Sequence, residues 1–196
     1  MIYLGLGAAC QVTHQLRRIG LVSETMFYDW LVTHHIRLIE TLPFNFGGSL
    51  FQEGYTLPAA GNYLVENATG LSFYPHDFQG LAEKDRALID EQIDAIRDKY
   101  IRRADRTRSV LSSGEDVCIV RHFFAETPEN IIRQQGELIA RLSTLYPETN
   151  FSYLWGSDFK VDQIELPFGT IHHLPKASTW HGDDAAWDKI FAVSRD

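Results

Sequence analysis

The segment from residue 117 to residue 156 constrains the fold of this chain more strongly than any other part of the sequence. It begins with the apolar run VCIVRHF at 117–123 and ends with a second apolar run, FSYLWG, at 151–156. Between the two runs, Thr127 and Pro128 are typical of the N-cap and first position of a helix, and apolar residues then recur at helical spacing. A strand, a helix and a second strand of these lengths predict a right-handed crossover between parallel strands.

The rest of the chain predicts a similar mixture of elements. Residues 1–6 form an apolar run ended by glycines, and helical spacing then continues until Gly20. Residues 43–75 are rich in glycine, asparagine, proline and aromatic residues, which indicates an irregular segment with a short strand or two, including 71–74. The polar stretch at 81–111 carries apolar residues at helical spacing, so we expect one long or broken amphipathic helix there.

Length and charge limit the class of protein. A chain of 196 residues with 44% hydrophobic residues is expected to form a single domain, 1–196, of the α/β class, in which helices cover the faces of a mostly parallel sheet. The formal net charge of −8 argues against a nucleic-acid partner. The sequence has no signal peptide and no apolar run long enough to span a bilayer, so we expect a cytoplasmic protein without a membrane partner.

Cys10 is the candidate nucleophile. It follows the GLGAA turn at the expected start of a helix, where the helix dipole and free backbone N–H groups favour the thiolate. The only other cysteine, Cys118, lies among apolar neighbours in the run at 117–123, which is typical of a small buried hydrophobic residue. The sequence therefore assigns chemistry to Cys10 and a packing role to Cys118.

A cysteine nucleophile needs a base, and His76 is the strongest candidate among eight histidines. It follows the apolar segment LSFY in a loop that also carries Asp77. If the segment at 71–74 pairs beside the strand at 1–6, His76 reaches the sheet edge where Cys10 begins its helix. Neighbouring side chains on an extended chain point to opposite sides, so we slightly favour Asp29 over Asp77 as the acid that orients the imidazole. The competing histidines are His34, His35, His172, His173 and His181.

Two other kinds of site find little support. The stretch GLGAAC lacks the third glycine of a dinucleotide-binding fingerprint, and no acidic residue ends a second strand at the required distance. The cysteines stand far apart, with no C-x-x-C or H-E-x-x-H pattern. We therefore expect neither a cofactor nor a metal.

Several blocks of the sequence resemble a known family. They are LGLGAACQVTHQLRRIGLVSETMFYDWLVT, then YPHDF, then DKYIRRADRTRSVL ahead of VCIVRHF, and finally WHGDDAAWDKIF. These blocks are similar to those of a bacterial and viral family of domains of unknown function that is labelled as papain-like cysteine peptidases. The resemblance implies Cys10 as nucleophile, His76 as base and Asp29 or Asp77 as the orienting acid, with a papain-like α+β fold as the alternative architecture. The chain departs from the family pattern at Val22 and at residues 25–28.

The leading functional expectation is a cysteine-dependent hydrolase or acyltransferase that acts on a small-molecule, peptide or glycan substrate. Arg102 and Arg103 also match the pattern of this family, and we expect them to bind a carboxylate or phosphate of the substrate. One alternative is a non-catalytic protein that holds a polar ligand such as a sugar in a pocket around Trp30, His76 and Trp180. A glycan-modifying transferase is the other alternative.

Overall fold

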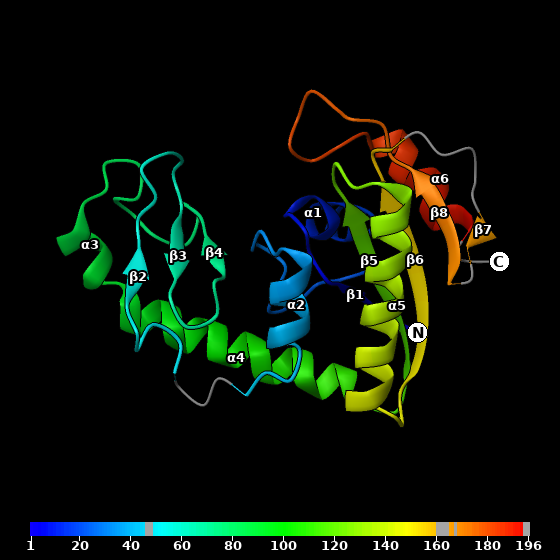
Figure 1. The fold of residues 1–196 in the computed structure, drawn as a ribbon, viewed down its shortest axis with the longest axis horizontal. Coiled ribbons are helices and arrows are strands. Elements are labelled where there is room, and N and C mark those ends of the chain that lie inside the picture. Colours follow the sequence, from blue (N-terminus) through cyan, green and yellow to red (C-terminus); the bar gives the residue numbers. More distant parts are fainter. Residues whose placement is uncertain (46–48, 160–164, 167, 194–196) are drawn as a thin grey trace.

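A computed structural model describes residues 1–45, 49–159, 165–166 and 168–193, and it has a mixed α/β fold (Figure 1). Its main sheet has the strand order β1-β5-β6-β8-β7, in which the first four strands run parallel and the last runs antiparallel to its neighbour. The predicted α/β class with a mostly parallel sheet is thus confirmed, in place of the mainly antiparallel sheet of papain-like folds. The strands are β1 (Ile2–Gly5), β5 (Asp116–Phe123), β6 (Asn150–Ser157), β7 (Glu165–Leu166) and β8 (Gly169–His173).

The predicted crossover unit is present between β5 and β6. Thr127 is the N-cap of helix α5 (Pro128–Leu145), and its side-chain oxygen accepts a hydrogen bond from Asn130 N at 3.3 Å. This contact satisfies one of the backbone N–H groups that every helix start leaves unpaired, and Pro128 needs no such partner. Strands β5 and β6 then pair in parallel along their full length.

Helices cover both faces of the main sheet. Along β5, Val117 and Ile119 belong to one core, whereas Cys118 and Val120 belong to the other, as the alternation of side chains along a strand requires. Helices α1 (Gln11–Arg18) and α6 (Asp184–Val193) pack on the face that carries Cys118. Helices α4 (Ile93–Leu111) and α5 pack on the opposite face.

A second, smaller sheet stands apart from the main sheet (Figure 1). It contains three antiparallel strands in the order β2-β3-β4. We expected the segment at 71–74 to pair beside the first strand, and this expectation is wrong, because β4 pairs with β3 in a local hairpin. Pairing of segments close in sequence costs less loop entropy than pairing with a distant strand. The strands are β2 (Tyr55–Thr56), β3 (Leu64–Glu66) and β4 (Ser72–Phe73).

The buried carboxylate of Glu66 stabilises this hairpin. It accepts hydrogen bonds from Ala68 N at 3.1 Å and from Thr69 N at 2.8 Å within the turn. It also accepts one from Phe51 N at 3.1 Å, which ties the preceding loop to the sheet. One side chain therefore satisfies several backbone donors that the turn leaves without partners.

A long helix connects the two sheets. The predicted amphipathic helix is broken into α3 (Arg86–Asp90) and α4 (Ile93–Leu111), and α4 runs from beneath the small sheet to the main sheet (Figure 1). Helix α2 (His35–Thr41) packs against α5. None of the helices in the described part of the chain has the length and apolar character needed to cross a bilayer.

Candidate active site

Cys10 lies where the main sheet ends and the first helix begins. After β1 the chain passes through a tight loop in which Gly7 has a φ of 57° and Ala8 a φ of 40°, and the Ala8 carbonyl accepts a hydrogen bond from Thr33 N at 3.2 Å. Glycine adopts such a φ without steric cost, so Gly7 allows the sharp turn. Cys10 is the N-cap of α1, and its carbonyl accepts a hydrogen bond from His14 N at 3.0 Å. The predicted place of Cys10 at a helix start is confirmed.

His76 and Asp77 follow β4 in a turn, and their side chains contact each other. His76 Nε2 lies 3.3 Å from Asp77 Oδ2. We expected an extended chain here, in which these side chains would point apart, but the hydrogen bond from Asp77 N to Tyr74 O at 2.9 Å closes a turn. Pro75 is the signal that could have predicted it, because proline is favoured at the second position of such turns.

Two residues of helix α4 hold the Asp77 side chain in place. Its buried carboxylate accepts hydrogen bonds from Tyr100 Oη at 2.7 Å and from Lys99 Nζ. Burial opposes ionisation of Asp77, but the hydrogen bonds from His76, Lys99 and Tyr100 outweigh it and hold the pKa of this carboxyl below its usual value. Asp77 is therefore a carboxylate at neutral pH, and it can stabilise positive charge on His76.

Asp29 lies in a different environment and is not the acid that contacts His76. Its buried carboxylate accepts a hydrogen bond from Met26 N at 2.7 Å and so closes the turn that leads to Trp30. Burial raises the pKa of Asp29, although the Met26 hydrogen bond opposes this shift. Our preference for Asp29 as the orienting acid is therefore corrected in favour of Asp77.

A cavity of about 440 Å³ brings most of the predicted residues together. Cys10 and His76 both line it, although no hydrogen bond joins the sulfur to the imidazole within the described residues. The cavity combines a thiol, an imidazole, a carboxylate, two cationic side chains and two indoles. The lining residues are Cys10, Trp30, His76, Asp77, Lys99, Arg103 and Trp180.

The thiol of Cys10 is less acidic than its position in the sequence suggested. Burial raises its pKa above the ordinary value, backbone hydrogen bonding at the helix start lowers it, and the carboxylates of Asp77 and Asp29 raise it further. The helix start does act in the expected direction, but burial and the two negative charges exceed it. Cys10 is therefore a protonated thiol at neutral pH, so any nucleophilic role requires a base.

The two arginines expected to bind substrate have different positions. Arg103 lines the cavity, whereas Arg102 is exposed elsewhere on α4 and is not among the lining residues. Residues four apart share one face of a helix, so Lys99 and Arg103 face the cavity together. Arg103 Nη1 is buried without a hydrogen-bond partner in the described part of the chain. A buried guanidinium nitrogen without a partner is suited to an anionic group of a ligand.

Two tryptophans form apolar walls of the cavity. Trp30 packs edge-to-face against His76, with ring centroids 5.8 Å apart, and the Arg17 guanidinium lies 5.8 Å from its ring centroid. Trp180 is 61% exposed, which is unusual for so large an apolar side chain, and its carbonyl accepts a hydrogen bond from Gln11 Nε2 at 3.3 Å. The structure thus brings Trp30, His76 and Trp180 to one cavity, as the sequence suggested.

None of the competing histidines lines this cavity. His35 Nε2, for example, is 2.8 Å from Glu137 Oε2 on α5, so it takes part in a local polar contact. The histidines that are not among the lining residues include His34, His35, His172, His173 and His181.

Sequence reasoning missed Lys99 and Tyr100 as parts of the site. Both lie in the DKY stretch that precedes the arginine pair. The available signal was helical spacing. Lys99 and Arg103 are four residues apart and share one face of the helix, whereas Arg102 is rotated by about 100° around the helix axis from Arg103. What could not be read from spacing was the partner of these side chains, since Asp77 is distant in sequence.

Comparison with known proteins does not assign the chain to a family. The chain is 24% identical to the uncharacterized protein R408 of Acanthamoeba polyphaga mimivirus, and the alignment covers 96% of each chain. No family model and no solved structure matches the chain.

We expect Cys118 to react much more slowly with alkylating agents than Cys10. Cys118 is 4% exposed in β5, and burial raises its pKa. Limited treatment of the native protein with iodoacetamide, followed by peptide mass spectrometry, should label Cys10 first. Cys118→Ser should cost about 1 kcal/mol of stability without changing the labelling of Cys10. Preferential labelling of Cys118 would reverse the assignment.

Proposed function

We propose that the protein is a cysteine-dependent acyl hydrolase or acyltransferase with Cys10 as nucleophile, His76 as general base and Asp77 as the acid that orients His76. The observation that carries this proposal is the contact between His76 Nε2 and Asp77 Oδ2 at the wall of the cavity that Cys10 also lines. A nucleophile, a base and a group that orients the base are the parts that covalent acyl transfer requires. The resemblance to a family labelled as papain-like cysteine peptidases supports the same assignment.

The proposed reaction begins with a neutral thiol. As Cys10 Sγ attacks the carbonyl carbon of the substrate, His76 accepts the thiol proton, and the Asp77 carboxylate stabilises the resulting imidazolium. The carbonyl oxygen becomes an oxyanion that can accept hydrogen bonds from free N–H groups in the first turn of α1. When the bond to the leaving group breaks, His76 returns the proton to that group, and a thioester on Cys10 remains. Water or another acceptor then attacks the thioester, and the thiol is restored.

The chemistry of the cavity suggests the class of substrate. Lys99 and Arg103 favour an acyl compound with a carboxylate or phosphate, and Trp30 and Trp180 favour an apolar or sugar portion beside it. We infer a small-molecule, peptide or glycan substrate, and a cytoplasmic setting in which the thiol stays reduced.

The exposed ring of Trp180 favours one alternative, a non-catalytic protein that binds a glycan on this aromatic surface. A glycan-modifying transferase would use the same cavity. Acyl-enzyme formation separates these functions from the proposed one, because neither alternative forms a covalent adduct on Cys10.

The test is to incubate the protein with activated esters, one bearing a carboxylate and one neutral, and to follow acylation of Cys10 by mass spectrometry. We expect acylation in the wild-type protein, and His76→Gln should slow it by about 100-fold, because the thiol then loses its base. His173→Gln, which changes an exposed histidine outside the cavity, is the matched control and should react at the wild-type rate. Acylation that is equally fast in both variants, or absent from Cys10 altogether, would refute the proposal.

A further inference from the structure

A second cluster of side chains lies beside the cavity and takes no part in the proposed reaction. It consists of His14 on α1, His181 in the segment before α6, and Asp184 at the start of α6. One potential ligand atom of each of these residues lies within 4.8 Å of those of the other two. Sequence spacing gave no sign of this cluster, because more than 160 residues separate His14 from the other two members.

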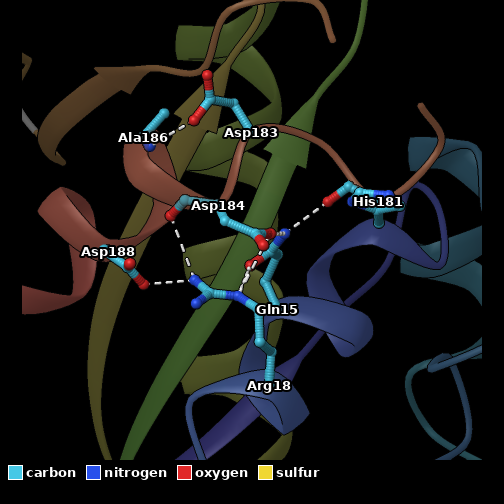
Figure 2. Close-up of polar contacts among 7 residues, drawn as sticks. All are labelled: Gln15, Arg18, His181, Asp183, Asp184, Ala186 and Asp188. Atoms are coloured by element: carbon cyan, nitrogen blue, oxygen red, sulfur yellow. Dashed lines mark hydrogen bonds and ion pairs between the residues drawn. The ribbon is translucent and has the colours of Figure 1, made fainter. Parts of the chain in front are cut away.

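A buried glutamine holds the two C-terminal members of the cluster in place. Gln15, which is fully buried, donates from Nε2 to the His181 carbonyl at 2.6 Å and to Asp184 Oδ1 at 2.8 Å (Figure 2). Arg18 Nε lies 3.3 Å from the same carboxylate oxygen, and the Arg18 guanidinium also contacts Asp188 (Figure 2). Outer groups of this kind commonly orient the side chains that bind metals.

The orientation of these groups leaves ligand atoms available. Within the described residues, the side-chain contacts of the Asp184 carboxylate all involve Oδ1, so Oδ2 has no competing partner. His181 Nδ1 is buried and also has no hydrogen-bond partner in this part of the chain. The His14 and His181 rings lie with their centroids 5.2 Å apart. A buried imidazole nitrogen without a partner points to a group that is not protein.

We propose that His14, His181 and Asp184 bind a divalent transition-metal ion of the zinc type. Two imidazole nitrogens and one carboxylate oxygen match the preference of such ions, whereas magnesium and calcium prefer oxygen ligands alone. Arg18 Nε and Gln15 Nε2 both contact Oδ1 of Asp184, so Oδ2 is the oxygen that would bind the ion.

The ion would fasten the segment before α6 onto α1. This segment already lies close to α1, because a Cβ added to Gly182 would come within 2.5 Å of Gln11 Nε2. Trp180 belongs to the segment, packs edge-to-face on His14 with centroids 5.1 Å apart, and lines the cavity of Cys10. Metal binding would therefore stabilise one wall of that cavity without taking part in its chemistry.

Isothermal titration of the full-length protein with zinc chloride tests the site, with cobalt and magnesium chloride titrated in parallel. Cys10→Ser/Cys118→Ser should serve as the background, so that binding to thiols does not contribute. We expect one zinc ion per chain, a similar site for cobalt and none for magnesium. His181→Ala and Asp184→Asn should each weaken zinc binding by about 100-fold or more. His34→Ala, which removes an exposed histidine outside the cluster, should leave it unchanged.

Two results would overturn this proposal. One is zinc binding that survives in both His181→Ala and Asp184→Asn, and the other is the absence of zinc binding from the double-serine background. Hydrogen exchange measured by mass spectrometry tests the structural consequence, because zinc should slow exchange of residues 176–184 in the wild-type protein and not in His181→Ala. Because the titration uses a protein without Cys10, its outcome is independent of whether Cys10 is a nucleophile.

Discussion

Replacement of Asp77 by alanine should lower the free energy of unfolding by about 3 kcal/mol, since removing one partner of a buried ion pair leaves the others without compensation. The Asp77 side chain is 1% exposed and accepts hydrogen bonds from Lys99 and Tyr100. In the variant, the buried Tyr100 hydroxyl loses its acceptor and the Lys99 ammonium its counter-ion. Urea unfolding at neutral pH measures the difference.

Asp94→Ala is the matched control for Asp77→Ala. Asp94 also pairs with a cation of α4, Arg97, at 2.7 Å, but its side chain is 82% exposed. Ion pairs at exposed positions contribute little, so this variant should lose no more than about 0.5 kcal/mol. Equal losses in the two variants would show that burial of Asp77 does not matter.

Acid should diminish the effect of Asp77→Ala. The pKa of Asp77 is lowered in the folded protein, so its contribution to stability is fully present above the pKa of the unfolded carboxyl, about 4. That contribution is lost as the pH falls through the lower, folded-state pKa. The difference in unfolding free energy between wild type and Asp77→Ala should therefore shrink below about pH 4. A difference that grows in acid would contradict the lowered pKa.

Trp155→Ala should cost about 4 kcal/mol, which is in the range for removing a large buried aromatic side chain. Trp155 is fully buried in β6 and stacks on Tyr153 with centroids 5.0 Å apart. Its indole N–H donates to the Phe168 carbonyl at 2.8 Å, so the variant also leaves that acceptor unpaired. Thermal unfolding followed by circular dichroism measures the loss.

Trp180→Ala is the control for Trp155→Ala, because it makes the same substitution at an exposed position. Trp180 is 61% exposed, and most of its surface is already in contact with water. This variant should retain the wild-type unfolding free energy to within about 0.5 kcal/mol. If it proved as damaging as Trp155→Ala, the segment before α6 would contribute far more to stability than its exposure indicates.

Periodic patterns predicted strands β1, β5 and β6 of the main sheet but not β7 and β8. The crossover from β5 through α5 to β6 was visible because long apolar runs and a capped helix are local features. The start of α1 at Cys10 was visible for the same reason, since glycines mark the turn before it. The small sheet was less visible, because its strands are only two or three residues long and carry no clear alternation.

The chemistry of the site was harder to predict. The contact between His76 and Asp77 depends on a turn that Pro75 favours, and an extended chain gives the opposite result. The raised pKa of Cys10 arises mainly from burial, which depends on segments far away in sequence. The cluster of His14, His181 and Asp184 likewise forms only when the last helix packs beside the first.

Helix α4 makes the site sensitive to changes in chain length. Near its middle, Lys99 and Tyr100 hold the Asp77 carboxylate, and about two turns later Thr107 Oγ1 accepts a hydrogen bond from Phe27 N at 2.9 Å. One inserted residue between these points would rotate one anchor against the other by about 100° and shift it by about 1.5 Å. Insertions and deletions should therefore accumulate in the loops of the small sheet, while the length of α4 stays fixed.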